Sequence, residues 1–341
     1  MIADTVARGR VTPDWDERVL ASHSAPHFMQ SRTWARIRSG GPWRVGAADL
    51  GVAAELPALV FEREAPGTGR LRHIPRLTGV TVADVPALTE RVHAERGEAF
   101  ATKLEIYQER DPGLDAAFAA AGWLPTRASQ YRFAVVADLA DGADEVLARM
   151  KKRARAEIRI GERNGVEVER VEVGGPGSEE MLALVRVTEE RSGAFFRRDD
   201  YLRAVWAGFA ADGRGELYLA RHEGRVVSGA FIARYGPRAW YKDGGSLRDV
   251  PNLMASRLLQ WRVMQELIAG GITAYDLGHV PPPDSGAGNG TGIQTFKTAF
   301  APVVEFQPAY LLPHSPAAEP WRTGESRFLA EYHAATGDYW Y

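Results

Sequence analysis

The chain has 341 residues, of which 45% are hydrophobic and 25% charged, with a formal net charge of -2 at pH 7. This length and composition predict a globular protein of two domains, and the near-neutral charge gives no overall attraction to nucleic acid. The absence of cysteine excludes disulfides, thiolate zinc sites, iron–sulfur clusters and a thiol nucleophile. The first residues lack the regions of a signal peptide, and no stretch reaches the roughly 18 apolar residues of a membrane span, so we expect a cytoplasmic protein.

The first half of the chain combines short β-type runs with helical ones. Alternating apolar and polar positions, rich in β-branched and aromatic residues, are typical of half-buried strands. The predicted strands cover residues 43–50, 57–64, 71–82, 101–108 and 131–138, and the predicted helices cover residues 86–100 and 113–122.

The second half begins with a long basic helix over residues 144–165, which Gly165 closes. The predicted strands that follow cover residues 166–173, 216–224, 225–236, 238–245, 273–280 and 303–306, and the predicted helices cover residues 179–193, 199–211, 255–271 and a short stretch of the tail. Strands in series, then a helix, then a strand is the order of an N-acetyltransferase-like α/β fold.

Acetyl-CoA fits this second half poorly, although the fold permits it. An acetyl-CoA enzyme needs free backbone N–H groups between the middle strand and the next helix, where they meet the pyrophosphate. That loop reads "GGSLRDVPNLMAS", and after Gly244 and Gly245 it places Asp249, Val250 and Pro251 where those groups should be. The glycine cluster at residues 286–292 lacks the ending of a nucleotide P-loop and is either a surface loop or a lid over a site.

Basic residues gather on the helix that opens the second half. Its helical projection puts Lys152, Arg155 and Arg159 roughly on one face, with Lys151 beside them. Such a face is either solvated or a track for phosphates, and the pattern alone favours the solvated face.

Near the end, "TGIQTFKTAFAPVVEF" places Lys297 between Phe296 and Phe300 at helical spacing. The chain has only five lysines, so a lysine here points to a task that arginine does not perform. A lysine ammonium is a compact point charge that can aim at one oxygen, whereas a guanidinium prefers a planar, bidentate partner. The alternative is a surface lysine flanked by two core phenylalanines.

Five segments in this order resemble the Fem family of peptidyltransferases, which move an amino acid from aminoacyl-tRNA to an amine of a peptidoglycan precursor. They are "ARMKKRARAEIRIGERNGVEV", "RSGAFFRRDDYL", "LYLARHEGRVVSGAFIARYGPRAWYKDGGS", "LLQWRVMQELIAGGITAYDLG" and "GIQTFKTAF". The stretch "FMQSRTWARIRSGGPW" is similar to a further Gln-Ser-x-x-Trp segment of that family. The resemblance covers nearly the whole chain.

The resemblance implies a fold and a division of the chain. We expect an α/β fold with mixed sheets, built of two tandem N-acetyltransferase-like (GNAT) domains. The first would cover residues 1–141, with the tail 313–341 folding back on it, and the second residues 142–312. No additional helical hairpin is expected to be inserted between residues 165 and 215, as in shorter members that lack a coiled-coil arm.

The resemblance also implies the site residues. Lys297 and Phe296 match the pair placed at the reacting ester, and Arg197 and Tyr201 match an arginine and a tyrosine near the acceptor phosphates. Arg38 and Trp43 match a basic and an aromatic position that bind the acceptor, and the further substrate-binding candidates are Tyr107 and Tyr241. The basic face with Lys151, Lys152, Arg155 and Arg159 is expected to contact tRNA phosphates. For Arg197 the competing interpretation is a helix N-terminus with surface charge, because Asp199 and Asp200 follow it.

The implied reaction needs neither a metal nor a redox cofactor. The aminoacyl ester is already activated, so an amine held about 3 Å from its carbonyl needs positioning, proton removal and stabilisation of the oxyanion. The eight histidines form no metal-spaced pair, and no general base stands out; the leaving ribose oxygen or a tRNA phosphate could take the proton.

Two other functions stay open. One keeps the aminoacyl-tRNA chemistry but joins the amino acid to a specialised metabolite or peptide. The other is an acetyl-CoA-dependent N-acyltransferase, and a purely binding module is more distant. In every case we expect a monomer without a transmembrane segment, with peripheral contact if the precursor is lipid-linked.

One position departs from the family pattern. Where the peptidoglycan members carry an acidic residue that helps to hold the acceptor, this chain has Tyr107, with Glu105 two residues earlier. Either Glu105 or Glu109 replaces the carboxylate, or the acceptor differs from the nucleotide-linked pentapeptide. A tyrosine cannot neutralise an ammonium, so the second interpretation predicts a lipid-linked precursor or a non-cell-wall amine.

Overall fold

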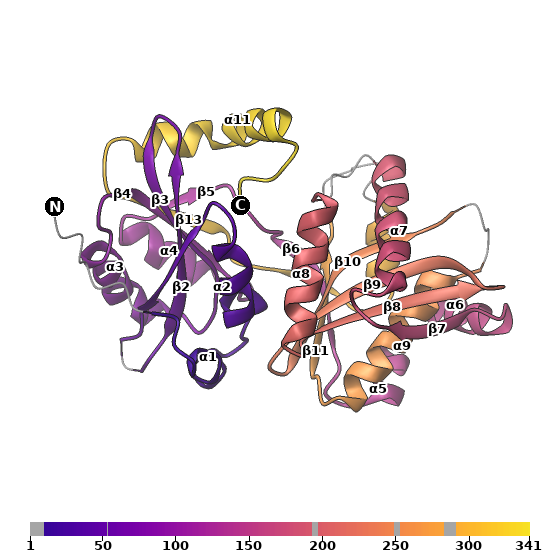
Figure 1. Ribbon diagram of the computed structural model, residues 1–341. Helices are drawn as coiled ribbons and strands as arrows, with labels where there is room; N and C mark the ends of the chain where they lie inside the picture. Colours follow the sequence, from indigo (N-terminus) through magenta and orange to yellow (C-terminus); the bar gives the residue numbers. More distant parts are fainter. Residues whose placement is uncertain (1–9, 53, 193–196, 249–252, 283–290) are drawn as a thin grey trace. The chain divides into compact units, whose positions relative to one another are not determined.

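The computed structural model describes residues 10–52, 54–192, 197–248, 253–282 and 291–341. The chain divides into two compact units (Figure 1), which we call unit 1 (residues 1–132 and 305–341) and unit 2 (residues 133–304). None of the helices in the described ranges is long and apolar enough to cross a membrane.

Unit 1 is built on a mixed six-stranded sheet. The first three strands are antiparallel, β3 and β4 are parallel, and β13 inserts antiparallel between β4 and β5. In sheet order the strands are β1 (Arg44–Asp49), β2 (Pro57–Ala65), β3 (Gly69–Leu77), β4 (Ala99–Ile106), β13 (Ala309–Pro313) and β5 (Leu124–Thr126).

Helices complete unit 1 and bury both faces of its central strands. Leu104 and Ile106 of β4 belong to a core that includes Leu88 and Phe118 from the covering helices, whereas Lys103 bonds to Glu325 of the last helix. This alternation follows from the two-residue period of a strand. The helices are α1 (Trp15–Ser22), α2 (Arg32–Ser39), α3 (Val85–Ala94), α4 (Pro112–Ala120) and α11 (Ala318–Thr336), with short 3₁₀ turns at Phe28–Gln30 and Val82–Asp84.

Unit 2 repeats the strand pattern in a seven-stranded sheet. Strands β8, β9 and β10 are antiparallel, β10 and β11 are parallel, and β11 pairs antiparallel with β6. In sheet order the strands are β12 (Val303–Glu305), β6 (Phe133–Asp138), β11 (Ala274–His279), β10 (Arg238–Ser246), β9 (Arg225–Tyr235), β8 (Gly215–His222) and β7 (Glu167–Val171).

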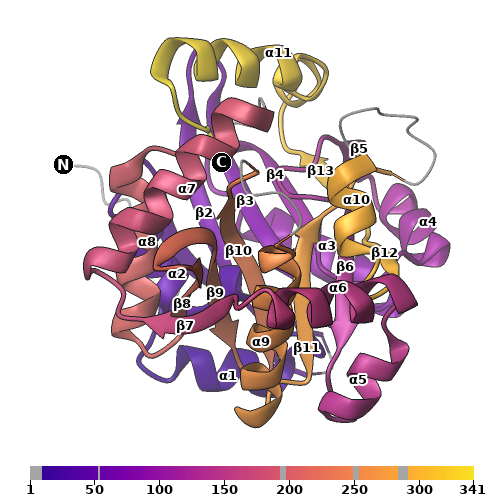
Figure 2. The same ribbon diagram turned by 90° about the vertical axis from the view of Figure 1, so that its right-hand side faces the viewer.

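Helices cover both faces of this second sheet (Figures 1 and 2). Apolar strand residues point alternately to the two faces, since Phe231 stacks on Trp206 of one helix layer and Ile232 belongs to the core on the other side. The first face carries α7 (Pro176–Ser192) and α8 (Asp199–Ala211), the second carries α5 (Ala143–Arg149), α6 (Lys152–Arg163) and α9 (Ala255–Ala269), and α10 (Thr291–Lys297) precedes β12.

Two strands pair with the sheet of the other half of the chain. Strand β6 follows the first sheet in sequence but pairs with β11 in the second, and β13 follows the second sheet but pairs with β4 in the first. Strand β6 lies beside the parallel pair β10 and β11, and β13 lies beside the parallel pair β3 and β4. Sequence analysis put residues 131–138 in the first domain and missed β13, because the partner of a strand is not encoded in its own alternation.

The basic helix expected over residues 144–165 is broken into α5 and α6. Met150 and Lys151 between them have extended ψ angles of 149° and 143°, and the Lys151 N–H donates to the carbonyl oxygen of Ala299 at 3.0 Å. A backbone bond to a distant segment therefore replaces the bond that would have continued the helix. The tail was expected to end in a short helix, but α11 has 19 residues.

Candidate functional site

The parallel strands β10 and β11 part soon after they meet. Their pairing in the described chain runs from Arg238↔Ala274 to Trp240↔Asp276. Beyond those pairs, the pairing of β10 with β9 shifts register after Tyr241, and that of β11 with β6 shifts after Asp276. We call this place the strand fork.

Lys297 reaches into the strand fork from the last position of α10. Its side chain is buried, and Nζ donates a hydrogen bond of 2.9 Å to the carbonyl oxygen of His279. A Cβ atom on Gly278 would lie 3.4 Å from that Nζ and 3.6 Å from the carbonyl oxygen of Tyr241, and Gly278 has a φ of +80°. Glycine adopts this conformation without strain and leaves room for the ammonium beside the backbone of β11.

The charge of Lys297 depends on its burial. Loss of hydration lowers the pKa of Lys297 to about 8, and the nearby Asp276 carboxylate opposes that shift. The group is therefore still mostly an ammonium at pH 7. An ammonium has three N–H donors, and the bond to His279 uses one of them among the described contacts. The arrangement can supply a poorly hydrated positive charge to an oxyanion, which is where such a charge is most effective.

Phe296 and Phe300 pack against a buried arginine that sequence analysis did not single out. The Phe296 and Phe300 rings meet edge to face at 5.5 Å, and the Arg257 guanidinium lies 4.5 Å from the first ring centre and 4.6 Å from the second. Arg257 Nη1 also donates to the carbonyl oxygen of Phe296 at 2.6 Å. The two phenylalanines therefore have the expected core role, but the lysine between them is buried in the strand fork and does not lie on the surface.

The two glycines of "GGSLRD" have packing roles. A Cβ atom on Gly244 would lie 1.7 Å from the Tyr241 hydroxyl oxygen, and one on Gly245 would lie 2.6 Å from the carbonyl oxygen of Leu184 in α7. Because glycine has no side chain, Gly244 leaves room for the Tyr241 ring and Gly245 leaves room for α7. Tyr241 also lines the strand fork, with its ring centre 5.9 Å from Lys297 Nζ. Asp249, Val250 and Pro251 lie outside the described residues, as do most of the glycines from 286 to 292.

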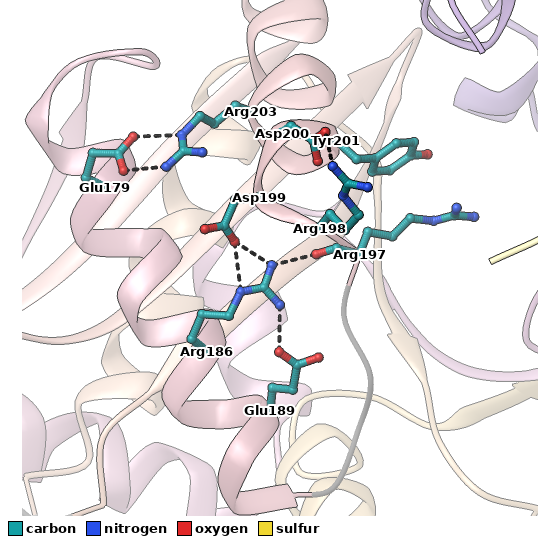
Figure 3. Close-up of polar contacts among 9 residues, drawn as sticks. All are labelled: Glu179, Arg186, Glu189, Arg197, Arg198, Asp199, Asp200, Tyr201 and Arg203. Carbon is teal, nitrogen blue, oxygen red and sulfur yellow. Dashed lines mark hydrogen bonds and ion pairs between the residues drawn. The ribbon is translucent and has the colours of Figure 1, made fainter. Parts of the chain in front are cut away.

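Arg197 and Tyr201 lie together at the start of α8 (Figure 3). The guanidinium carbon of Arg197 is 4.6 Å from the centre of the Tyr201 ring. The backbone below them is fixed by Arg186 of α7, which donates to the carbonyl oxygen of Arg197 at 2.6 Å and to Asp199 at 2.8 Å. The helix-start interpretation is also partly right, because Arg198 pairs with Asp200 at 3.0 Å.

The basic residues of α6 differ in what they contact. Lys151, Lys152 and Arg159 are exposed, whereas Arg155 donates to the carbonyl oxygens of Ala148 and Met150 at 2.6 and 3.1 Å and so closes the end of α5. A groove of about 620 Å³ runs beside α10. Its polar lining residues are Arg149, Lys151, Gln294, Thr295 and Thr298.

Arg38 and Trp43 lie in unit 1 and form an aromatic cluster. The Arg38 guanidinium is 5.4 Å from the Trp43 ring centre, and the Trp43 side chain is buried. Its ring stacks on Tyr341 at 6.0 Å. Arg38 is accordingly better placed than Trp43 to meet a ligand, and the acceptor role of both residues stays a prediction.

Tyr107 and Glu105 are both buried in unit 1. The Tyr107 ring stacks on Phe306 at 4.3 Å, and the Glu105 carboxylate contacts His73 Nε2 at 3.3 Å and accepts from the Ser129 N–H at 2.8 Å. Burial alone would raise the pKa of Glu105, but the His73 bond and nearby cations hold it well below its ordinary range. Neither side chain has the exposure expected of an acceptor ligand, and their binding role stays a prediction.

Sequence reasoning missed the residues that build the strand fork. Asp276, Gly278 and His279 form part of "YDLGHV", which reads as an ordinary strand. Gly278 was the available signal, since a glycine inside a strand pattern often marks a close backbone approach. No group of three metal-ligating side chains occurs in the portion of the chain that is described.

Known proteins of similar sequence include a domain family and curated relatives. Residues 148–297 match the family model of the acetyltransferase (GNAT) domain. The chain is 22% identical over 235 residues to the lipid II:glycine glycyltransferase of Staphylococcus haemolyticus, covering 64% of this chain and 56% of that protein. It is 23% identical over 229 residues to the protein of that name in Staphylococcus aureus, covering 62% and 54%. The chain thus spans about half the length of these curated relatives.

Solved structures show the same fold. The crystal structure of FemX aligns with a TM-score of 0.78 and 19% identity, covering 92% of this chain and 98% of that one. A tandem GNAT protein from the clavulanic acid biosynthesis pathway aligns with a TM-score of 0.51 and 11% identity, covering 91% and 98%. The expected α/β fold of two GNAT-like units is therefore confirmed, and the sequence relatives are glycyltransferases by name.

Proposed function

We propose that this protein moves an amino acid from aminoacyl-tRNA to an amine of a peptidoglycan precursor, as in the building of interpeptide bridges. The observation that carries the proposal is the buried Lys297 ammonium in the strand fork, beside Phe296 and Tyr241. Support comes from the Staphylococcus relatives, which are named lipid II:glycine glycyltransferases. The packing roles of Gly244 and Gly245 argue against acetyl-CoA.

The chemistry requires charge stabilisation more than a strong base. The neutral acceptor amine attacks the ester carbonyl carbon, a C–N bond forms, and negative charge develops on the carbonyl oxygen, where the Lys297 ammonium stabilises it. The C–O bond to the ribose then breaks, the amine nitrogen loses a proton and the ribose oxygen gains one. Lys297 keeps its own proton throughout.

The donor is proposed to approach along the basic groove beside α10. Lys151 connects the groove to the exposed part of α6, and its Nζ lies 3.5 Å from the Thr298 hydroxyl oxygen, one residue past Lys297. A polyanion on this surface would bring its acylated end toward the strand fork. The exposed Lys151 at this groove supports the proposal, because a cation there would attract the phosphates of an aminoacyl-tRNA end.

Neutralising Lys151 and Lys152 is expected to weaken binding of all tRNAs alike, because contacts to phosphates carry no sequence information. The slope of log affinity against log salt should fall by about one to two units. Fluorescence anisotropy at a series of salt concentrations measures it. The control is Arg322→Gln/Arg327→Gln on α11, which changes net charge equally at a different surface. An unchanged slope in the lysine variant would return α6 to the solvated-face interpretation.

The acceptor is proposed to be lipid-linked. Of the two carboxylates that could replace the family's acidic residue, Glu105 is buried and Glu109 is exposed. The support for a lipid-linked acceptor is therefore the name of the curated relatives, which includes lipid II. A competition among the nucleotide-linked pentapeptide, its lipid-linked form and unrelated amines, all with the same charged tRNA, tests both the function and the acceptor. We expect product from the lipid-linked form. Preference for the nucleotide-linked form contradicts the acceptor assignment, and product from unrelated amines alone contradicts the cell-wall function.

A further inference from the structure

Lys297 can reach the strand fork only if α10 is held in place. This helix has seven residues, which is too short to be stable through its own backbone bonds. The carbonyl groups of a helix's last turn have no partner within the helix. One of them, the carbonyl oxygen of Phe296 directly before Lys297, accepts the 2.6 Å bond from Arg257.

Arg257 is held on its other side by α6. Its Nε atom lies 2.9 Å from Oε2 of Glu157, whose Oε1 accepts from Arg153 at 2.7 Å. The Arg257 and Glu157 side chains are only 6% and 10% exposed. The close crossing of α6 and α9 permits this pairing, since a Cβ atom on Gly161 would lie 3.0 Å from Cβ of Leu258.

The buried pair is hard to explain by stability alone. Removing two charges from water costs about as much as their attraction returns, and apolar residues of similar volume often serve equally well. The guanidinium, however, has donors in a rigid fork. It can bond the Glu157 carboxylate and the Phe296 carbonyl at once while its flat face covers the Phe296 and Phe300 rings.

We propose that Arg257, oriented by Glu157, is a positioning residue that sets the reach of Lys297 into the strand fork. It touches no reacting atom in this role. The inference rests on the proposed function for its effect on transfer, but its effect on Lys297 can be measured without any substrate.

The test compares Arg257→Met with Arg262→Met. Arg262 lies on the same helix and pairs with Glu162 of α6 at 3.1 Å, but both side chains are more than 40% exposed, at 45% and 42%. The control thus removes an α9–α6 ion pair at the surface and leaves α10 untouched. The first readout is the pKa of Lys297, followed through ¹³C-labelled lysine signals in a pH titration. With five lysines in the chain, the signal is assigned by its loss in Lys297→Met.

In Arg257→Met the pKa of Lys297 should rise from about 8 toward the roughly 10.4 of a hydrated lysine, because the misplaced side chain regains water. Single-turnover transfer should fall about 10- to 100-fold, as expected for a displacement of about 1 Å. Arg262→Met should match the parent in both. Arg257→Lys keeps the charge beside Glu157 but lacks the planar fork that spans both partners, so intermediate values are expected, and it serves as the folded variant if Arg257→Met does not fold.

An unchanged Lys297 pKa and an unchanged rate in the Arg257 variants would overturn the proposal. If the parent transfers nothing from charged tRNA, the proposed function is wrong. A raised Lys297 pKa in Arg257→Met would still support the positioning role in that case. The two failures are therefore distinguishable.

Discussion

Replacing Lys297 by alanine is expected to slow the transfer step about 10²–10³-fold, the usual loss when one group that stabilises an oxyanion is removed. The reason is the buried Lys297 ammonium at the strand fork, which donates a hydrogen bond to the carbonyl oxygen of His279. Single-turnover transfer from charged tRNA measures the chemical step. Lys297→Arg should also be slow, because a guanidinium is larger and prefers a planar partner. Parental rates in both variants would show that Lys297 has no catalytic role.

The absence of native cysteine offers a chemical rescue at this position. Lys297→Cys would contain a single thiol, and alkylation with 2-bromoethylamine converts it to a side chain of nearly the length and charge of lysine. We expect the alkylated protein to recover much of the lost rate. Alkylation with iodoacetamide, which adds a neutral group at the same sulfur, is the matched control and should restore nothing.

The pH profile separates charge stabilisation from base catalysis. Burial lowers the pKa of Lys297 to about 8, so an ammonium that stabilises the oxyanion is lost as the pH rises through that value. The acceptor amine, in contrast, becomes more reactive as it deprotonates. We expect a bell-shaped profile with a descending limb near pH 8 that disappears in Lys297→Arg. A rate that increases through pH 8 in the parent, with that increase lost in Lys297→Arg, would instead identify Lys297 as a base.

The second large effect is expected on stability, at the ion pair that joins α11 to the sheet of unit 1. Lys103 Nζ lies 2.7 Å from Oε1 of Glu325, and the two side chains are 0% and 1% exposed. The Tyr341 hydroxyl also bonds Glu325, and the Lys103 ammonium lies 4.1 Å from the Tyr341 ring centre. Lys103→Met leaves the Glu325 carboxylate buried without its cation, which costs about 3–5 kcal/mol.

Hydrogen exchange resolved by peptide measures this loss in β13 and α11, and so separates unit 1 from unit 2. The double variant Lys103→Met/Glu325→Leu should be far less destabilised, since it buries no charge. Removal of the exposed Arg327–Glu331 pair on the same helix is the control and should change exchange little. Equal protection in Lys103→Met and the parent would show that the ion pair does not hold α11.

Local patterns were sufficient to predict most elements of both sheets. The run 199–211 was predicted as a helix and is α8 with the same ends, because its acidic start and apolar period agree. The patterns failed where distant segments decide the outcome. Strand β13 depends on β4 and β5, and the break between α5 and α6 depends on Ala299.

The candidate site divides in the same way. Lys297 was identified from its rarity and its phenylalanine neighbours, which are local features. Its burial, its lowered pKa and its position in the strand fork depend on where β10 and β11 part. These two strands are too far apart in sequence for a local pattern to include both. Arg257 was missed because it lies in an ordinary helix, and the two residues that it bonds, Glu157 and Phe296, are 100 and 39 positions away.

The measurement that tests the central claim most directly is a parallel incubation of the protein with the lipid-linked precursor and one of two donors. One reaction contains a pool of tRNAs charged with all amino acids, the other acetyl-CoA, and Lys297→Ala is run beside each. We predict that the mass of the precursor increases by one aminoacyl residue with charged tRNA alone and that Lys297→Ala abolishes most of this product. An acetylated precursor, or no product from charged tRNA, would contradict the account.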